Sequence, residues 1–224
     1  MADLPTLDGP RAAPHGGGPA RHLVVLLHGL GADGHDLIQL APYLGQAAPD
    51  AAFVAPHAPE ACDMAPTGLQ WFSLQEQSPR AIEAGAVGAA PALDAFLDAE
   101  LARHGLGSDA LALCGFSQGA MMALHRGLHR PAGAACVCAW SGVLPGAEQL
   151  ASTIAARPPT LLVHGDADPV VPPQALEAAR TALDANAVPV TAEPRPGLSH
   201  GIDERGIELA GAFLRRYLTG VAGP

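Results

Sequence analysis

The segment Leu111–Met122 contains the pattern Gly115-x-Ser117-x-Gly119 between an apolar run and a helix-forming run. Strand, sharp turn and helix in this order are the layout of a nucleophile elbow, which holds one serine hydroxyl at the tip of the turn. A side chain at either glycine would collide with neighbouring backbone in so tight a turn, and the serine must hold an unfavourable φ/ψ combination. The chain has 26 glycines, so the spacing alone is weak evidence, and a glycine-rich turn with an incidental serine is the alternative.

Strand-like and helix-like patterns alternate along the chain. Short apolar runs predict strands at residues 23–27, 51–55, 111–114, 134–139, 160–163 and 188–192. Apolar residues at helical spacing predict helices at residues 36–47, 80–104, 118–128, 147–155, 172–186 and 203–218. Pro91 is a point where the second helix could kink or divide. This alternation predicts an α/β fold with a mostly parallel, doubly wound sheet and helices on both faces.

Two segments differ from this regular pattern. Residues 1–20 are rich in proline and glycine, which indicates a flexible segment with at most a short edge strand near residues 4–7. Residues 60–79 form a long irregular loop that carries aromatic side chains, and such loops usually have a function. Residues 21–224 contain no visible linker or repeat, so we expect them to form one domain.

Composition excludes several classes of function. The net charge is −10 and every one of the 12 basic residues is arginine, so no basic stripe for nucleic acid exists and an anionic membrane would repel the protein. No leader-like or membrane-spanning apolar run is present, which predicts a cytoplasmic protein without stable membrane association. The four cysteines lack metal-ligand spacing, and Cys136 and Cys138 are expected to be buried strand residues.

Three chemically reactive side chains follow three different predicted strands. Ser117 follows the elbow strand, Asp166 and Asp168 follow the strand at 160–163, and His200 follows the last strand. Ligands of doubly wound sheets bind at these carboxyl ends. Serine hydrolysis needs a base for the hydroxyl proton and an acid that orients the base, and the order Ser, Asp, His is that of α/β-hydrolases. We expect Asp168 to be the acid and Asp166 to be a structural neighbour that bonds to nearby N–H groups.

The same chemistry needs donors for the oxyanion that develops on the acyl oxygen. One is expected from the backbone N–H of Gln118, directly after the serine, and the other from the loop after the first strand, for which we select Leu30 N–H. That loop also fits a dinucleotide-binding pattern, Gly29-x-Gly31-x-x-Gly34. The next strand ends without the carboxylate that would bind a ribose, which argues against this alternative.

Taken together, these residues resemble the phospholipase/carboxylesterase family, which includes acyl-protein thioesterases and small bacterial carboxylesterases. The matching stretches are His28-Gly29-Leu30-Gly31 with Asp33 and Gly34, Trp71-Phe72, Gly115-Phe116-Ser117-Gln118-Gly119-Ala120, Ser141-Gly142 with Leu144-Pro145, His164-Gly165 with Asp168 and Val170-Val171-Pro172, and His200-Gly201. The resemblance implies an α/β-hydrolase fold without a lid domain, with no metal or cofactor. It also implies a triad of Ser117, Asp168 and His200, with oxyanion donors at Leu30 and Gln118.

The expected substrate is a small-molecule ester or thioester, with short- to medium-chain carboxylic esters favoured. Longer acyl chains, as for an acyl-protein thioesterase or a lysophospholipase, are the alternative, and a catalytically silent binding module is the alternative of another class. The residues expected to line the substrate site are Gly29, Met64, Leu69, Trp71, Phe72, Ser141, Val143, Leu144 and Val170. A loop at 60–79 that only packs its own aromatic side chains remains possible. The protein is expected to be a monomer or a homodimer.

Overall fold

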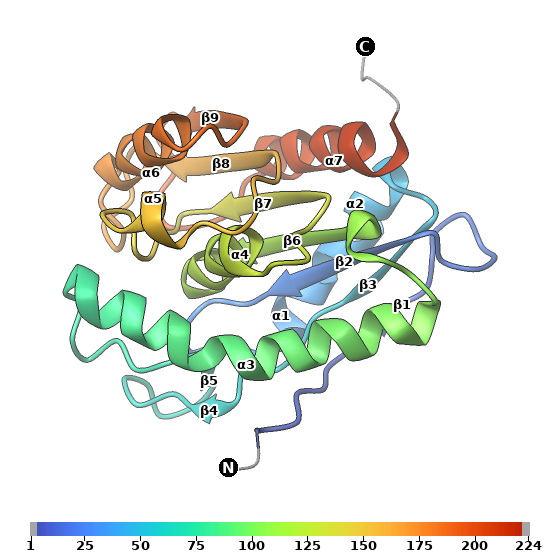
Figure 1. Ribbon diagram of the computed structural model, residues 1–224, viewed down its shortest axis with the longest axis horizontal. Helices are drawn as coiled ribbons and strands as arrows, with labels where there is room; N and C mark the ends of the chain where they lie inside the picture. Colours follow the sequence, from blue (N-terminus) through green and yellow to red (C-terminus); the bar gives the residue numbers. More distant parts are fainter. Residues whose placement is uncertain (1–3, 221–224) are drawn as a thin grey trace.

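The computed structural model describes residues 4–220, which contain a seven-stranded sheet (Figure 1). The strand order is β1-β3-β2-β6-β7-β8-β9, and all neighbours are parallel except β1, which runs antiparallel to β3. The strands are β1 (Arg11–Ala12), β2 (His22–Leu27), β3 (Ala51–Val54), β6 (Leu111–Phe116), β7 (Cys136–Trp140), β8 (Thr160–Gly165) and β9 (Val190–Arg195). The predicted mostly parallel α/β sheet is therefore confirmed.

Helices cover both faces of this sheet. The helices are α1 (Gly34–Leu37), α2 (Ala41–Ala47), α3 (Pro79–His104), α4 (Gln118–His129), α5 (Leu150–Thr153), α6 (Gln174–Ala185) and α7 (Glu204–Thr219). Helices α3, α4 and α6 pack on one face, and α2 and α7 pack on the other. Among residues 4–220, no helix combines the length and the apolar composition needed to cross a bilayer.

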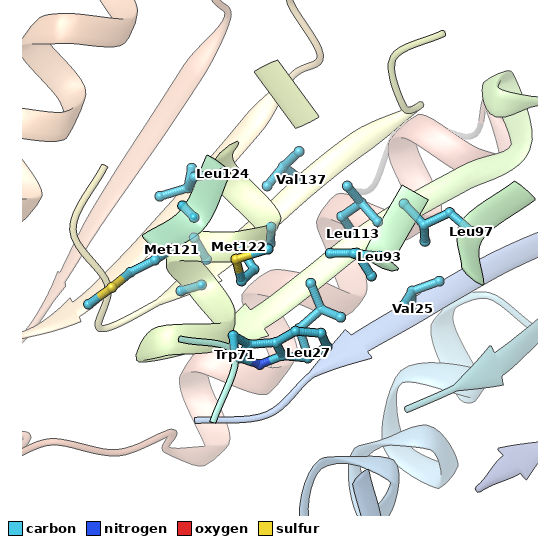
Figure 2. Close-up of a cluster of buried hydrophobic side chains, with 14 of the residues drawn as sticks. Val25, Leu27, Trp71, Leu93, Leu97, Leu113, Met121, Met122, Leu124 and Val137 are labelled. Carbon is cyan, nitrogen blue, oxygen red and sulfur yellow. The ribbon is translucent and has the colours of Figure 1, made fainter. Parts of the chain in front are cut away.

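The continuous apolar run of β2 is explained by burial on both faces. Val25 and Leu27 point into the larger core, with side chains of α3 and α4, whereas Val24 and Leu26 point into the core beneath α2 and α7. Figure 2 shows the larger core, where Leu93 of α3 lies among side chains from the sheet and from α4. Full burial of one such aliphatic side chain stabilises the fold by about 1.5–3 kcal/mol.

Helix α3 is unbroken although it contains a proline. Ser78 caps its start by accepting a hydrogen bond from Ala81 N–H at 3.2 Å, and Gly105 ends it in the left-handed conformation at φ 66°. Pro91 lies on the exposed side, where the carbonyl that loses its helical partner can bond to water. The possible division of the helix at this residue does not occur.

The predicted edge strand exists but its position was wrong. It is Arg11–Ala12 rather than residues 4–7, because Arg11 and Ala12 are the residues that pair with Val54 and Phe53 of β3. Gly9 passes so close to β3 that a Cβ there would lie 2.1 Å from Ala55 O. Arg11 then reaches α3 and donates two hydrogen bonds to the buried carboxylate of Glu100, at 3.1 and 2.7 Å.

Two predicted helices are shorter than expected. The prediction for 36–47 overlooked Pro42, which cannot donate a hydrogen bond to Ile38 O, and the chain tightens into a 3₁₀ turn at Ile38–Leu40 between α1 and α2. Of the helix predicted at residues 147–155, the structure contains only the short helix α5. After α5 the chain becomes extended, and Ala155 N–H bonds to Leu128 O instead of to a helical carbonyl.

The loop at 60–79 is less irregular than predicted. Two short antiparallel strands, β4 (Glu60–Ala61) and β5 (Leu69–Gln70), form a hairpin within it. Leu69 also pairs with the loop after β2, because Gly31 N–H donates to Leu69 O and Leu69 N–H donates to Ala32 O, both at 2.9 Å. The hairpin is therefore attached to the segment that carries Leu30.

Candidate active site

Ser117 occupies the sharp turn between β6 and α4. Its backbone has φ 55° and ψ −117°, a conformation that is unfavourable for residues other than glycine. Ser117 N–H donates a hydrogen bond to Trp140 O at 2.9 Å. A Cβ at Gly115 would lie 2.1 Å from Gly119 O, and one at Gly119 would lie 1.9 Å from Leu27 O. Both glycines and the strained serine match the tight elbow that the motif predicts.

A chain of hydrogen bonds joins Ser117, His200 and Asp168. His200 Nε2 lies 3.0 Å from Ser117 Oγ, and His200 Nδ1 lies 2.7 Å from Asp168 Oδ2. A carboxylate only accepts, so the proton of the neutral ring belongs on Nδ1, and Nε2 is free to accept the serine proton. The structure thus brings together the three residues that the sequence places at separate strand ends.

Asp168 and Asp166 have different surroundings. Asp168 is buried, and its Oδ1 accepts hydrogen bonds from the N–H groups of Val170 and Val171 at 2.8 and 2.9 Å. Burial alone would raise the pKa of Asp168, but the hydrogen bonds from His200 and these two N–H groups outweigh it and lower the pKa. Asp166 is exposed and accepts from Gly197 N–H at 2.7 Å, as expected of a structural neighbour.

The loop after β9 holds His200 in place. It is joined to the loop after β8, where Ala167 N–H donates to Leu198 O at 3.1 Å and a Cβ at Gly165 would lie 2.1 Å from the same oxygen. The His200 ring packs at a tilt against Phe116, with 4.8 Å between ring centroids. His200 is therefore held by backbone contacts of its loop, by Asp168 and by an aromatic side chain.

The two expected oxyanion donors belong to residues beside the elbow. Gln118 directly follows the serine, and Leu30 follows Gly29, where a Cβ would lie 3.3 Å from Ser117 Cβ. Within residues 4–220, neither the Leu30 nor the Gln118 N–H donates to a backbone carbonyl. Both are therefore available to a ligand.

Buried His28 fixes the loop that carries Leu30. Ala58 N–H donates to its Nε2 at 3.0 Å, so the ring proton is on Nδ1, which donates to Gly29 O at 2.8 Å. Burial lowers the pKa of His28, which keeps the ring neutral in this arrangement.

The side chain of Gln118 has a contact that the sequence interpretation missed. It is fully buried, its Oε1 accepts from Trp71 N–H at 3.0 Å, and its Nε2 donates to Phe72 O at 2.7 Å. Trp71 Nε1 in turn donates to His28 O at 3.0 Å. The only sequence signal was a glutamine followed by six apolar residues at the start of the helix.

The comparisons with known proteins agree with this geometry. Residues 12–218 match the sequence model of the family described as Phospholipase/Carboxylesterase. The chain belongs to this family. It is 32% identical over 197 residues to the esterase YpfH of Escherichia coli K12, covering 88% of this chain and 83% of that protein. It is 34% identical over 167 residues to acyl-protein thioesterase 1 of Saccharomyces cerevisiae, covering 69% of this chain and 73% of that one.

The solved structures give the same fold. The crystal structure of esterase PE8 has a TM-score of 0.90 and 43% identity, covering 95% of this chain and all of that one. Arabidopsis thaliana SOBER1 has a TM-score of 0.79 and 26% identity, covering 89% of this chain and all of that one. The protein is thus a hydrolase with the α/β-hydrolase fold, of the carboxylesterase and acyl-protein thioesterase type.

The nine residues expected to line the substrate site differ in exposure. Gly29, Trp71, Phe72, Ser141 and Leu144 are buried, Leu69 and Val143 are half-buried, and Met64 and Val170 are exposed. Trp71 and Phe72 belong to the larger core, so the loop does pack its own aromatic side chains (Figure 2 labels Trp71). Two apolar side chains of the set, Met64 at 50% and Val170 at 64% exposure, are open to solvent.

A cleft of about 790 Å³ lies between the start of α3, residues 143–149 and α6. Its apolar lining includes Ile82, Val143, Leu144 and Pro145. The preceding residue, Gly142, is adjacent to the elbow, because a Cβ there would lie 3.1 Å from Ser117 O. The Gly142–Pro145 segment therefore connects the elbow with an apolar cleft.

Backbone contacts explain the three glycines that resemble a dinucleotide-binding pattern. Gly29 lies against Ser117, Gly31 has φ 78°, and a Cβ at Gly34 would lie 2.0 Å from Ala55 O. None of these roles needs a nucleotide. Among the described residues, no group of three or more His, Cys, Asp or Glu side chains could hold a metal ion.

Proposed function

We propose that the protein is a serine carboxylesterase that hydrolyses short- to medium-chain carboxylic esters through an acyl-enzyme on Ser117. The observation that carries the proposal is the hydrogen-bonded chain from Ser117 Oγ through His200 to the buried carboxylate of Asp168. The available N–H groups of Leu30 and Gln118 support it, because acyl transfer develops an oxyanion beside the nucleophile.

The hydrogen bonds of the site support each proton transfer of the proposed reaction. His200 Nε2 takes the Ser117 proton as Oγ bonds to the acyl carbon, and the Leu30 and Gln118 N–H groups donate to the oxygen that becomes negative. The imidazolium then gives its proton to the leaving alcohol oxygen or thiol sulfur, and the acyl group stays on Ser117. Water attacks the carbonyl carbon of this ester while His200 takes a proton from the water. The imidazolium then returns that proton to Ser117 Oγ as the bond from Oγ to the acyl carbon breaks and the carboxylic acid leaves. Asp168 stays ionised throughout.

The apolar surroundings support a substrate with an alkyl acyl chain. The cleft beside Gly142–Pro145 offers apolar contact next to the elbow. The exposed side chain of Met64 lies in the hairpin attached to the Leu30 loop, and that of Val170 lies beside Asp168. A longer acyl chain on a thioester or lysophospholipid is the second candidate. The likeness to the yeast protein named acyl-protein thioesterase 1 favours it.

Hydrolysis of p-nitrophenyl acetate, butyrate, octanoate and palmitate, with palmitoyl-CoA as the thioester, tests both proposals. We expect the native protein to hydrolyse butyrate or octanoate fastest, and Ser117→Ala to lose at least about 10³-fold of that rate. If the native protein hydrolyses these esters no faster than Ser117→Ala, the protein is not a serine esterase, and the binding-module alternative is favoured. Highest kcat/KM with palmitate or palmitoyl-CoA would favour the second candidate.

A further inference from the structure

A second histidine contacts the carboxylate of Asp168. His164, in β8, is only 2% exposed, and its Nε2 lies 3.3 Å from Asp168 Oδ2. This is the same oxygen that accepts from His200 Nδ1 at 2.7 Å. No step of the reaction proposed above uses His164.

The partners of His164 determine which ring nitrogen carries its proton. Nε2 lies 3.0 Å from Val171 O and 3.3 Å from Asp168 Oδ2, and both oxygens can only accept. Nε2 therefore carries the hydrogen, which it donates to Val171 O while it lies in contact with Asp168 Oδ2. The tautomer is opposite to that of His200, which has its proton on Nδ1.

These contacts close a ring around the acid. His164 donates to Val171 O, and Val171 N–H donates to Asp168 Oδ1 at 2.9 Å. Val170 N–H is the second donor to Oδ1, whereas Oδ2 accepts from His200 Nδ1 and lies 3.3 Å from His164 Nε2. A carboxylate has about four acceptor sites, and protein hydrogen bonds use three of them here. Asp168 cannot rotate without losing these contacts, of which those to His164 and Val171 are buried.

We propose that His164 is a positioning residue, which acts through Asp168 by keeping Oδ2 directed at His200 Nδ1. The proposal rests on the proposed function, since it concerns the acid of that reaction. Within residues 4–220, the ring of His164 contacts Val171 O and Asp168 and forms no hydrogen bond with Ser117 or His200. Its effect reaches the serine through the carboxylate and His200.

A purely structural role for His164, through its bond to Val171 O, is the competing explanation, and matched variants separate the two. Gln places its amide nitrogen four bonds from Cα, as His places Nε2, so His164→Gln keeps the donor. His164→Asn places its amide nitrogen one bond closer, and His164→Leu has no donor. Val163→Ala is the control, because Val163 is the neighbouring residue of β8 and faces the core beneath α7.

Steady-state kinetics with p-nitrophenyl butyrate would measure these variants, with thermal unfolding as the check on folding. We expect kcat to fall about 10- to 100-fold in His164→Leu and His164→Asn, with KM within about twofold, because a misdirected base slows chemistry rather than binding. His164→Gln should be at least about fivefold faster than His164→Leu. Val163→Ala should unfold at lower temperature and keep kcat within about twofold.

A double-mutant cycle with Asp168→Asn decides whether His164 acts through the acid. In that background we expect His164→Asn to change kcat by less than about twofold, because the group it positions is already lost. The proposal would be overturned if His164→Asn lowered kcat as much in the Asp168→Asn background as it does in the wild type. Wild-type kcat in a folded His164→Asn variant would overturn it as well. If the wild-type rate does not depend on Ser117, the proposed function itself has failed, and the two failures are distinguishable.

Discussion

The side-chain oxygen of Gln118 accepts a hydrogen bond from the backbone N–H of Trp71, so the residue next to the nucleophile also holds the loop at 60–79. The same amide donates to Phe72 O. One residue thus contributes a backbone N–H toward the expected oxyanion and a side chain that anchors the neighbouring loop.

Replacing Gln118 by Met tests this anchor while leaving the backbone N–H unchanged. Two buried backbone groups would lose their partner, which should destabilise the protein by about 2–4 kcal/mol. We also expect kcat/KM to fall and the preference for acyl chain length to broaden. Urea unfolding and the p-nitrophenyl ester series would measure both effects. The exposed Gln75 provides the control, since Gln75→Met should change stability by less than about 0.5 kcal/mol.

Asp168→Asn and Asp166→Asn form a matched pair. The first should lower kcat about 10³- to 10⁴-fold, because an amide neither orients His200 in the required tautomer nor stabilises its cation. The second should remain within about threefold of wild type, since an amide oxygen can still accept from Gly197 N–H. Similar losses in two folded variants would show that the acid is assigned wrongly.

His125 should make the protein sensitive to mild acid. Burial, followed by the charges of His129 and Arg126, lowers its pKa from 6.5 to about 3. The unfolded chain then binds the proton more readily than the folded protein does. The stability that neutral His125 contributes is therefore fully present above pH 6.5 and is lost as pH falls toward 3. For one histidine, the free energy of unfolding can change by at most about 1.4 kcal/mol per pH unit.

Urea unfolding between pH 6.5 and 4.5 would measure that slope for the wild type and for His125→Leu. The variant should show a flatter dependence, whereas the same substitution at exposed His35 should leave the slope unchanged. An equal slope in wild type and His125→Leu would exclude His125 as the source.

The ion pair between Arg11 and Glu100 should stabilise the N-terminal segment. Burial alone would raise the pKa of Glu100, but the hydrogen bonds of Arg11 outweigh it and lower the pKa. Arg11→Ala leaves a buried carboxylate with Arg103 at 3.1 Å, and should cost about 1–3 kcal/mol. The double variant Arg11→Met with Glu100→Met should be more stable than Arg11→Ala in the same urea titration.

The sequence was informative wherever structure depends on local chemistry. The elbow around Ser117 and the side chains at the strand ends could be placed because turn glycines and strand patterns are local signals. Gly31 pairs with Leu69, and Gln118 bonds to Phe72, across 38 and 46 residues of chain. Such contacts have no local pattern and could not be predicted. Pro42 was a local signal that the prediction overlooked.

The backbone conformation of Ser117 has a consequence for how far this chain could be stabilised. At φ 55° and ψ −117° a residue with a side chain is strained, by about 1–3 kcal/mol, and glycine is not. Glycine at this position would make the fold more robust and remove the hydroxyl on which the proposed reaction depends. The most stable sequence for this backbone is therefore an inert one, and selection for durability alone would drive the chain away from activity.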